Sequence, residues 1–167
     1  MNYKEASEYW IKKDAQSKKV EKEELFKRIE DFILNHNTMA LATGYGDEVR
    51  CTPIEYNYYD GCFYLFSEGG LKFKYLEKNK NVAAAIYEPY SGFSSIHSLQ
   101  IQAVAEVVPE DSDEFISIAK RKGINLEAIK KMNASFHLLK LTPKKYNFLD
   151  SSLKKDGYSN RQEYIFD

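Results

Sequence analysis

The chain has 167 residues, of which 43% are hydrophobic and 14% aromatic. That length suits one domain, and the apolar content is enough for a packed core, which excludes a disordered chain. With 24 basic and 25 acidic residues the net charge is −1, so the composition gives no overall attraction to nucleic acid or anionic lipid. We therefore expect one soluble domain, residues 1–167, with no nucleic-acid or membrane partner.

The first 36 residues have the spacing of helices. Apolar residues recur three or four positions apart among alternating charges, first from Tyr3 to Trp10 and then from Leu25 to Ile33. A break falls around residues 15–19. We predict two helices here, and we expect Tyr9 and Trp10 to belong to the core rather than to reach a partner subunit.

From residue 38 the pattern changes to that of an antiparallel sheet or barrel, because short β-branched or aromatic stretches, several of them alternating, are typical of strands. The predicted strands are 39–43, 49–59, 62–67, 82–87, 99–108 and 135–141. In the strand 99–108 we expect a buried row of alternating residues, Leu99, Ile101, Ala103, Ala105 and Val107. The predicted helices between them are 71–79, 111 to about 123, and 126–132. The fold class that follows is mainly β with helices.

Asp60-Gly61 predicts a hairpin, because a two-residue turn of this kind needs positive φ at both positions. The register that follows pairs residues whose numbers sum to 121, so that Ile54 faces Ser67. Alternation along the strands then places Arg50, Thr52 and Ser67 on one face, at the end remote from the turn, if no bulge intervenes. This face is polar at that end and carries one cation.

The second strand of this hairpin runs directly into Glu68-Gly69-Gly70 and a helix. Two glycines let main-chain N–H groups approach a ligand closely, a helix start favours an anion, and Lys72 lies in the first turn. Arg50 can bind two oxygens, while Ser67 and Thr52 supply hydroxyl groups. These residues predict a phosphate-binding corner. The alternative is that the glycines only end a strand and the lysines form a solvated helix face.

The location and the cysteines give a further expectation. No apolar run approaches the ~20 residues that a membrane helix needs, and residues 1–14 lack the apolar segment of a secretory signal. Cys51 and Cys62 are the only cysteines, and the predicted register places them out of line for a disulfide. We expect unpaired thiols in a reducing compartment, and hence a cytoplasmic protein.

The segment from Arg50 to Tyr87 resembles the FMN-binding split β-barrel proteins of the pyridoxamine 5'-phosphate oxidase superfamily. An Arg-x-x-Pro strand, a hairpin, a strand that ends in Ser, a Lys that opens a helix, and an Asn before a buried strand occur in that order. The similarity extends over about residues 37–108, and no GxxxxGK[ST] or GxGxxG motif competes with it. The resemblance implies a split antiparallel β-barrel of FMN-binding type over residues 37–167, with inserted helices, behind an N-terminal helical segment, residues 1–36.

The resemblance also implies the residues that bind the cofactor. Arg50, Ser67 and Lys72 match positions that hold the FMN phosphate. Phe66 and Thr52 match positions that contact the flavin or its ribityl chain, and Gln100 matches a glutamine that reaches the flavin. In this family FMN usually lies at a two-fold dimer interface. We therefore expect a homodimer with flavin at the interface.

The chain departs from the oxidases proper near its C-terminus. Arg161 keeps an arginine that contacts pyridoxal phosphate, but Glu163 stands where a histidine would be, and residues 121–135 lack the Ser- and Arg-rich substrate pattern. The chain is more similar to small bacterial flavin-nucleotide-binding, general stress or nitroimidazole-resistance-type relatives. We expect an FMN-dependent oxidoreductase that transfers electrons or hydride from NAD(P)H to a small acceptor, with no catalytic acid or base assigned.

Two other hypotheses stay open at this point. The first is a non-catalytic protein that stores or senses flavin or haem, with His97 or His137 as a candidate axial ligand. The second is a cofactor-free interaction domain on the same barrel. His36, His97 and His137 are widely separated, and no Cys, His and carboxylate spacing indicates zinc, so no metal-ion site is expected.

Overall fold

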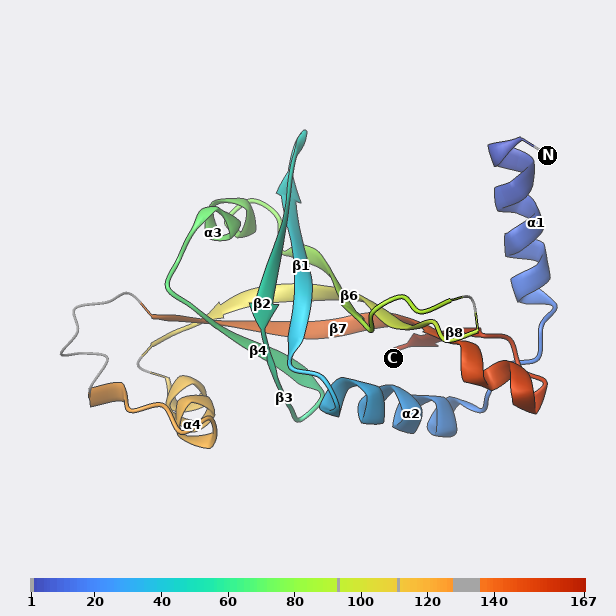
Figure 1. Ribbon diagram of the computed structural model, residues 1–167. Coiled ribbons are helices and arrows are strands. Elements are labelled where there is room, and N and C mark those ends of the chain that lie inside the picture. Colours follow the sequence, from blue (N-terminus) through green and yellow to red (C-terminus); the bar gives the residue numbers. More distant parts are fainter. Residues whose placement is uncertain (1, 93, 111, 128–135) are drawn as a thin grey trace.

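The computed structural model describes residues 2–92, 94–110, 112–127 and 136–167 (Figure 1). Its centre is an antiparallel sheet of eight described strands in the order β2-β1-β5-β6-β7-β4-β3, with β8 beside β7. The strands are β1 Thr38–Tyr45, β2 Glu48–Glu55, β3 Asn57–Tyr59, β4 Cys62–Ser67, β5 Asn81–Tyr87, β6 His97–Val108, β7 His137–Asp150 and β8 Arg161–Ile165. The helices are α1 Tyr3–Ala15, α2 Lys22–Leu34, α3 Leu71–Leu76, α4 Asp113–Arg121 and the 3-10 helix η1 Ser151–Asp156.

The two longest strands curl the sheet into a half-barrel. The first part of β7 pairs with β4 and its last part pairs with β8, while β6 runs along the whole of its other side. The register shifts between Gln102 and Ala103, and such an irregularity bends a strand. The expected fold class is therefore confirmed: mainly β with helices, a split antiparallel barrel with N-terminal helices.

The core fills the inside of this curled sheet. Leu99, Ile101 and Ala103 alternate inward along β6, as predicted, and α2 covers one side with an apolar stripe that includes Ile29 and Ile33. Val107, which we expected to continue the inward row, is exposed. Its neighbour Val108 is buried instead against Phe115 and Leu138, because α4 covers the opposite face of the sheet there.

The predicted hairpin is correct at its turn and wrong at its far end. Asp60 and Gly61 have φ of 52° and 78°, and Tyr58 faces Phe63 as the register requires. The long first strand is interrupted at Tyr56, and β2 pairs with β1 rather than with β4, so Ile54 faces Met39 instead of Ser67.

Two contacts explain this change of partner. A second hairpin turn at Gly46-Asp47, with φ of 60° at Gly46, lets β2 pair with β1 along its whole length. At the interruption, the buried hydroxyl of Tyr56 donates to the carbonyl oxygen of Ile33 at 2.7 Å, which fixes the chain against the end of α2. The pairing with β4 therefore stops after the three residues of β3.

The remaining helices and strands differ in smaller ways from the prediction. Helices α1 and α2 are confirmed, but Tyr9 and Trp10 are 46% and 49% exposed, so their expected place in the core is wrong. Strand β7 extends to Asp150, and η1 and β8 were not predicted. Of the helix predicted at 126–132, residues 126–127 are helical and the rest lies outside the described residues. No helix among the described residues is both long and apolar enough to cross a membrane.

Candidate functional site

The corner between β4 and α3 is the connection through which the chain leaves the sheet and enters α3 (Figure 1), and it is held by its own hydrogen bonds. Gly69 and Gly70 have φ of 134° and 102°, which side chains other than hydrogen disfavour. The hydroxyl of Ser67 donates to the Gly69 carbonyl oxygen and accepts from the Gly69 N–H, both at 3.2 Å. The amine of Lys72 donates to the same carbonyl oxygen at 2.5 Å. The predicted turn therefore brings Ser67 and Lys72 together.

Arg50 and Lys72 form an uncompensated positive site at this corner. Lys72 is only 8% exposed, and its pKa is lowered, first by burial and then by the positive charge of Arg50. Among the described residues neither side chain has a carboxylate partner within ion-pair distance. Two cations that repel each other in a partly buried place favour the binding of an anion.

Two buried hydroxyl groups lie on the same face as Arg50. Thr43 faces Arg50 across the β1–β2 ladder, and Thr52 lies two residues further along β2, so all three point to one side of the hairpin. The Oγ1 atoms of Thr43 and Thr52 are buried and have no hydrogen-bond partner among the residues that the structure describes. Leaving a buried hydroxyl unpaired costs about 1–3 kcal/mol, which a ligand oxygen at this place would recover.

Thr43 was not among the predicted site residues. The sequence signal that identifies Thr43 is the Gly46-Asp47 turn. Residues that pair across the hairpin at this turn have numbers that sum to 93, and Thr43 and Arg50 are such a pair. Without that second hairpin, β1 had no register relative to Arg50. The site therefore gains a hydroxyl group from β1, a strand that was not predicted to contribute to it.

Phe66 lies on the opposite face of β4 from Ser67. Its ring stacks on Phe136 with centroids 4.9 Å apart and meets Phe115 edge-on at 6.1 Å. The Phe66 side chain thus belongs to the small core beneath α4. From this strand, the corner receives only the Ser67 side chain and the main chain.

Gln100 lies on the outer face of the sheet, in a separate hollow of about 350 Å³ whose lining includes Ser98, Asn147, Arg161 and Glu163. Across the sheet, Gln100 pairs with Ala85 on β5, Ala85 with Ala40 on β1, and Ala40 with a residue of β2. Gln100 is therefore three strand spacings, or roughly 14 Å, from β2. The structure therefore places Gln100 apart from the predicted phosphate-binding residues Arg50, Thr52, Ser67 and Lys72.

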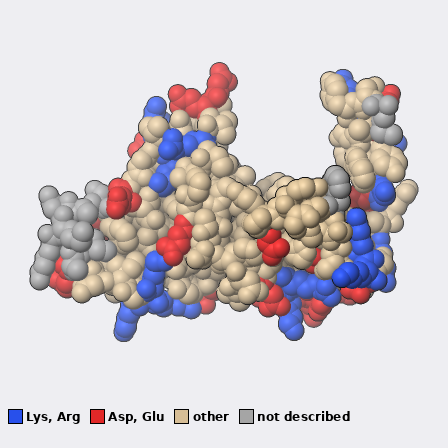
Figure 2. Space-filling model, in the orientation of Figure 1, with Lys and Arg blue, Asp and Glu red and all other residues tan. Residues whose placement is uncertain are grey.

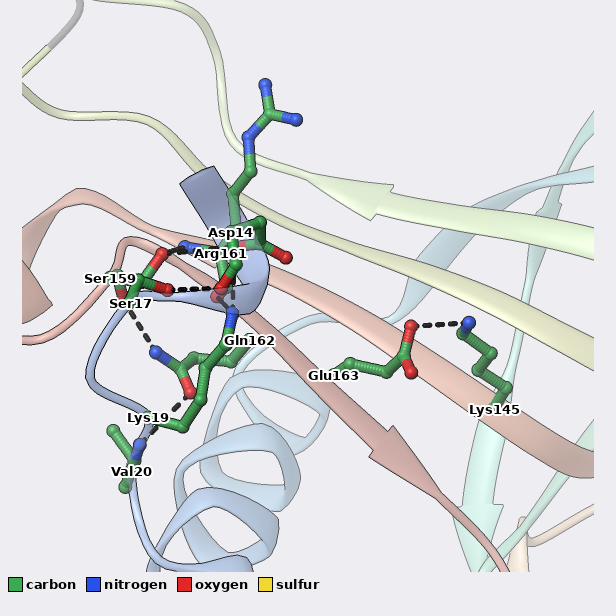
Figure 3. Close-up of polar contacts among 9 residues, drawn as sticks. All are labelled: Asp14, Ser17, Lys19, Val20, Lys145, Ser159, Arg161, Gln162 and Glu163. Carbon is green, nitrogen blue, oxygen red and sulfur yellow. Dashed lines mark hydrogen bonds and ion pairs between the residues drawn. The ribbon is translucent and has the colours of Figure 1, made fainter. Parts of the chain in front are cut away.

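The same hollow contains the C-terminal residues that resembled the oxidases' final segment. Glu163 forms an ion pair with Lys145, and the Arg161 side chain points away from both (Figure 3). The Arg161 guanidinium lies 5.5 Å from the ring of Trp10 and has no carboxylate partner among the described residues. Nearby, Gln162 accepts from the Val20 N–H at 3.1 Å, which ties β8 to the segment before α2.

The unpaired hydroxyls give the first testable expectation. Replacing Thr52 or Thr43 with Val keeps the shape but removes a hydroxyl that has no partner among the described residues, so the free energy of unfolding of the ligand-free protein should not fall. Affinity for a phosphate ligand should fall roughly 3- to 10-fold, the value of one neutral hydrogen bond. Urea unfolding and ligand titration check both. Thr38→Val is the control, because Thr38 lies on β1 like Thr43 but has an exposed hydroxyl bonded to Asn37. It should change neither the free energy of unfolding nor the affinity.

The sequence matches the pyridoxamine 5'-phosphate oxidase family over residues 25–150, and the chain belongs to that family. The match includes β1, β2, β4 and α3, and so the whole phosphate corner. Among curated proteins none matches the chain.

Several solved structures have the same fold. ChuZ from Campylobacter jejuni is 21% identical with a TM-score of 0.66, over 99% of this chain and 69% of that one. A FAD-binding protein from Mesorhizobium loti is 17% identical with a TM-score of 0.59, over 71% and 87%. The haem storage protein HutZ from Vibrio cholerae is 20% identical with a TM-score of 0.57, over 71% and 89%. At these identities the likeness concerns the fold.

The donor set at the corner fits a phosphate monoester better than a metal ion. It consists of two cations and hydroxyl groups, whereas metal ions require carboxylate, imidazole or thiolate ligands. Across residues 2–92, 94–110, 112–127 and 136–167, no group of three His, Cys, Asp or Glu side chains is arranged to hold a metal. Cys51 is exposed and Cys62 half-buried, and both are free thiols.

Proposed function

We propose that this protein binds FMN at the β4–α3 corner and acts as an oxidoreductase that passes electrons or hydride from NAD(P)H to a small acceptor. The observation that supports this best is that two cations and two buried hydroxyl groups lie together, none of which has a carboxylate or hydrogen-bond partner of the matching kind in the described part of the chain, apart from the Lys72 bond to the Gly69 carbonyl oxygen. A phosphate with negative oxygens satisfies all four groups at once. Family membership makes FMN the leading ligand.

Each residue has a distinct part in this proposal. Arg50 and Lys72 bind the phosphate, Thr43 and Thr52 donate hydrogen bonds to its oxygens or to the ribityl chain, and Ser67 holds the turn that carries Lys72. Phe66 contributes its main chain, and Gln100 is proposed to contact the flavin from the outer face of the sheet. The bound flavin supplies the redox chemistry, while these side chains hold and orient it.

The proposal includes a homodimer with the flavin at its interface and a cytoplasmic location. Arg50 is exposed in the single chain, so one side of the corner is open and a second subunit has room to cover it. Many aromatic residues, 14% of the chain, suit such an interface.

Steady-state oxidation of NADH and NADPH by the FMN-loaded protein tests the oxidoreductase role. We expect a rate well above that of the same concentration of free FMN. A rate equal to that of free FMN would instead identify a protein that stores or senses flavin. A protein that retains no flavin after reconstitution would contradict the cofactor assignment itself.

A second candidate function is haem binding, since HutZ, a haem storage protein, shares the fold. His137 is half-buried, and its Nδ1 lies 3.1 Å from Glu110, an arrangement that orients a ring whose other nitrogen binds iron. His97 has a similar partner, with Nε2 at 3.5 Å from Asp150. Haem titration should then give a Soret band that is lost in His137→Ala or His97→Ala. A spectrum unchanged in both variants would remove this candidate.

The affinity for FMN should fall as the pH rises into the alkaline range. The pKa of Lys72 is lowered by burial and by Arg50, and phosphate binding requires its protonated amine. Affinity is therefore full below this lowered pKa and is lost as the pH passes through it, before an ordinary lysine with a pKa of ~10.4 would lose its proton. FMN titrations across this range check the expectation. Lys72→Arg should abolish the alkaline loss, and an equal loss in that variant would contradict it.

A further inference from the structure

Helix α1 packs against very little of its own chain. A reciprocal capping box closes its first turn, and the segment that follows it is tied to β8, so both ends are well defined. None of its residues is buried, and Tyr3, Trp10 and Ile11 are 81%, 49% and 66% exposed. A helix of 13 residues is marginal in water unless an apolar face is packed. Within the described residues, α1 buries no side chain, and its contacts with the rest of the chain are made near its C-terminal end, by Trp10 with Arg161 and by Asp14 with Lys19 and Ser159.

The β1–β2 hairpin forms a second projection, which rises from the middle of the molecule on the same side as α1 (Figures 1 and 2). Tyr45 and Val49 near its tip are 57% and 80% exposed. An open groove of about 360 Å³ beside them is lined partly by the small residues Ala42, Gly44 and Ala83. The surface between the two projections is hollowed and carries few charged side chains (Figure 2).

We propose that α1 docks along the β1–β2 hairpin of a second copy of this chain. The two copies are related by a two-fold axis that passes between α1 and the hairpin and is perpendicular to both. This rotation places the hairpin of the second copy antiparallel to α1 of the first. The contact is then made twice, as in every isologous dimer. The lengths agree, because 13 helical residues span ~20 Å and a strand of 8 residues spans ~26 Å.

The charges support this direction of approach. The hairpin tip carries Asp47 and Glu48, and the last turn of α1 carries Lys12 and Lys13. The antiparallel arrangement brings the acidic tip to the basic turn, whereas hairpin against hairpin would bring two acidic tips together. Asp47 and Lys12 have no ion-pair partner in the described part of the chain, so both are available for this contact.

The docking places α1 of one subunit beside the phosphate corner of the other, because the same hairpin carries Arg50 and Thr52. The partner helix then borders the side of the corner that a single chain leaves open. This consequence rests on the proposed function, whereas the docking itself rests on the exposed apolar residues, the groove and the charges.

Charge reversal tests the docking in the full-length protein by sedimentation equilibrium. Lys12→Glu and Asp47→Lys should each raise the dimer dissociation constant roughly tenfold, since the pair occurs twice, and the double variant should return close to wild type. Trp10→Glu should raise it at least as much. Ile116→Glu, at an equally exposed apolar position on α4, is the control and should leave it unchanged. A wild-type monomer, an unaffected Trp10→Glu dimer or no recovery in the double variant would each overturn the docking.

Crosslinking distinguishes this arrangement from helix against helix. Ser7 lies on the exposed face of α1 between Tyr3 and Trp10, and Cys51 is an exposed native thiol on β2. In a Cys62→Ser background, which removes the other free thiol, Ser7→Cys treated with a short dimaleimide should give covalent dimers that disappear when Cys51→Ser is added. Dimers that persist would indicate α1 against α1 and overturn the proposal. FMN affinity measured on the same samples separates the two hypotheses. A monomer that binds FMN would contradict only the docking, and a dimer that does not bind FMN would contradict only the proposed function.

Discussion

Lys72→Met is expected to raise the dissociation constant for FMN by roughly 10- to 100-fold while leaving riboflavin binding unchanged. The variant removes a buried cation and with it the charge-assisted bond that we propose this amine makes to the phosphate. Such a bond is worth about 1.5–3 kcal/mol, and every ~1.4 kcal/mol is about tenfold in affinity. Riboflavin lacks the phosphate and so does not use this amine. Fluorescence titration with each ligand measures the two dissociation constants.

Two further variants define this result. Arg50→Ala should behave like Lys72→Met, because Arg50 is close enough to lower the pKa of Lys72 and we propose that both cations bind the same phosphate. Lys74→Met should have little effect, since Lys74 lies on the same helix but is exposed and approaches Glu48 at 3.9 Å. An equal loss of FMN and riboflavin in Lys72→Met would place the phosphate elsewhere.

The largest effect on stability is expected for Phe63→Ala, which should lower the free energy of unfolding by about 3–5 kcal/mol. Phe63 is fully buried, and its ring lies 5.3 Å from that of Tyr56, 5.0 Å from Tyr58 and 6.5 Å from Tyr146. Its removal leaves a cavity among rings that join β3, β4 and β7, which the surrounding strands cannot fill. Urea unfolding measures the shift in midpoint.

The matched control for this variant is Tyr87→Ala, on β5. Tyr87 is 64% exposed, so its loss should change the free energy of unfolding by no more than about 0.5 kcal/mol. A loss below about 1 kcal/mol for Phe63→Ala, or an equal loss for both variants, would contradict the position of Phe63 at the centre of the barrel.

The sequence predicted the fold class well because the alternation of β6 and the Asp60-Gly61 turn are local signals. The break at Tyr56 could not be predicted in the same way. Residues 49–59 are rich in β-branched and aromatic residues and have the pattern of one strand, and the interruption depends on a hydrogen bond from Tyr56 to the carbonyl oxygen of Ile33 in α2. The helical spacing of α1 was equally visible, but spacing alone does not reveal which surface, if any, covers Trp10.

For the candidate site, the residues near the turn were predictable and the hydroxyl across the hairpin was not. Gly69-Gly70 and Lys72 are adjacent in the sequence, so their chemistry can be inferred without a three-dimensional structure. Thr43 joins them only through the register of β1 and β2, and its unpaired hydroxyl is a property of packing. Gln100 was named through the family resemblance, and its distance from the corner depends on the order of four strands.

The most direct test of the central claim is a calorimetric titration of the wild-type protein with FMN and, separately, with riboflavin. Phosphate binding by Arg50 and Lys72, at about 1.5–3 kcal/mol for each charged contact, predicts that FMN binds at least ~100-fold more tightly than riboflavin. Equal affinities, or no heat with either ligand, would contradict a phosphate site at the β4–α3 corner.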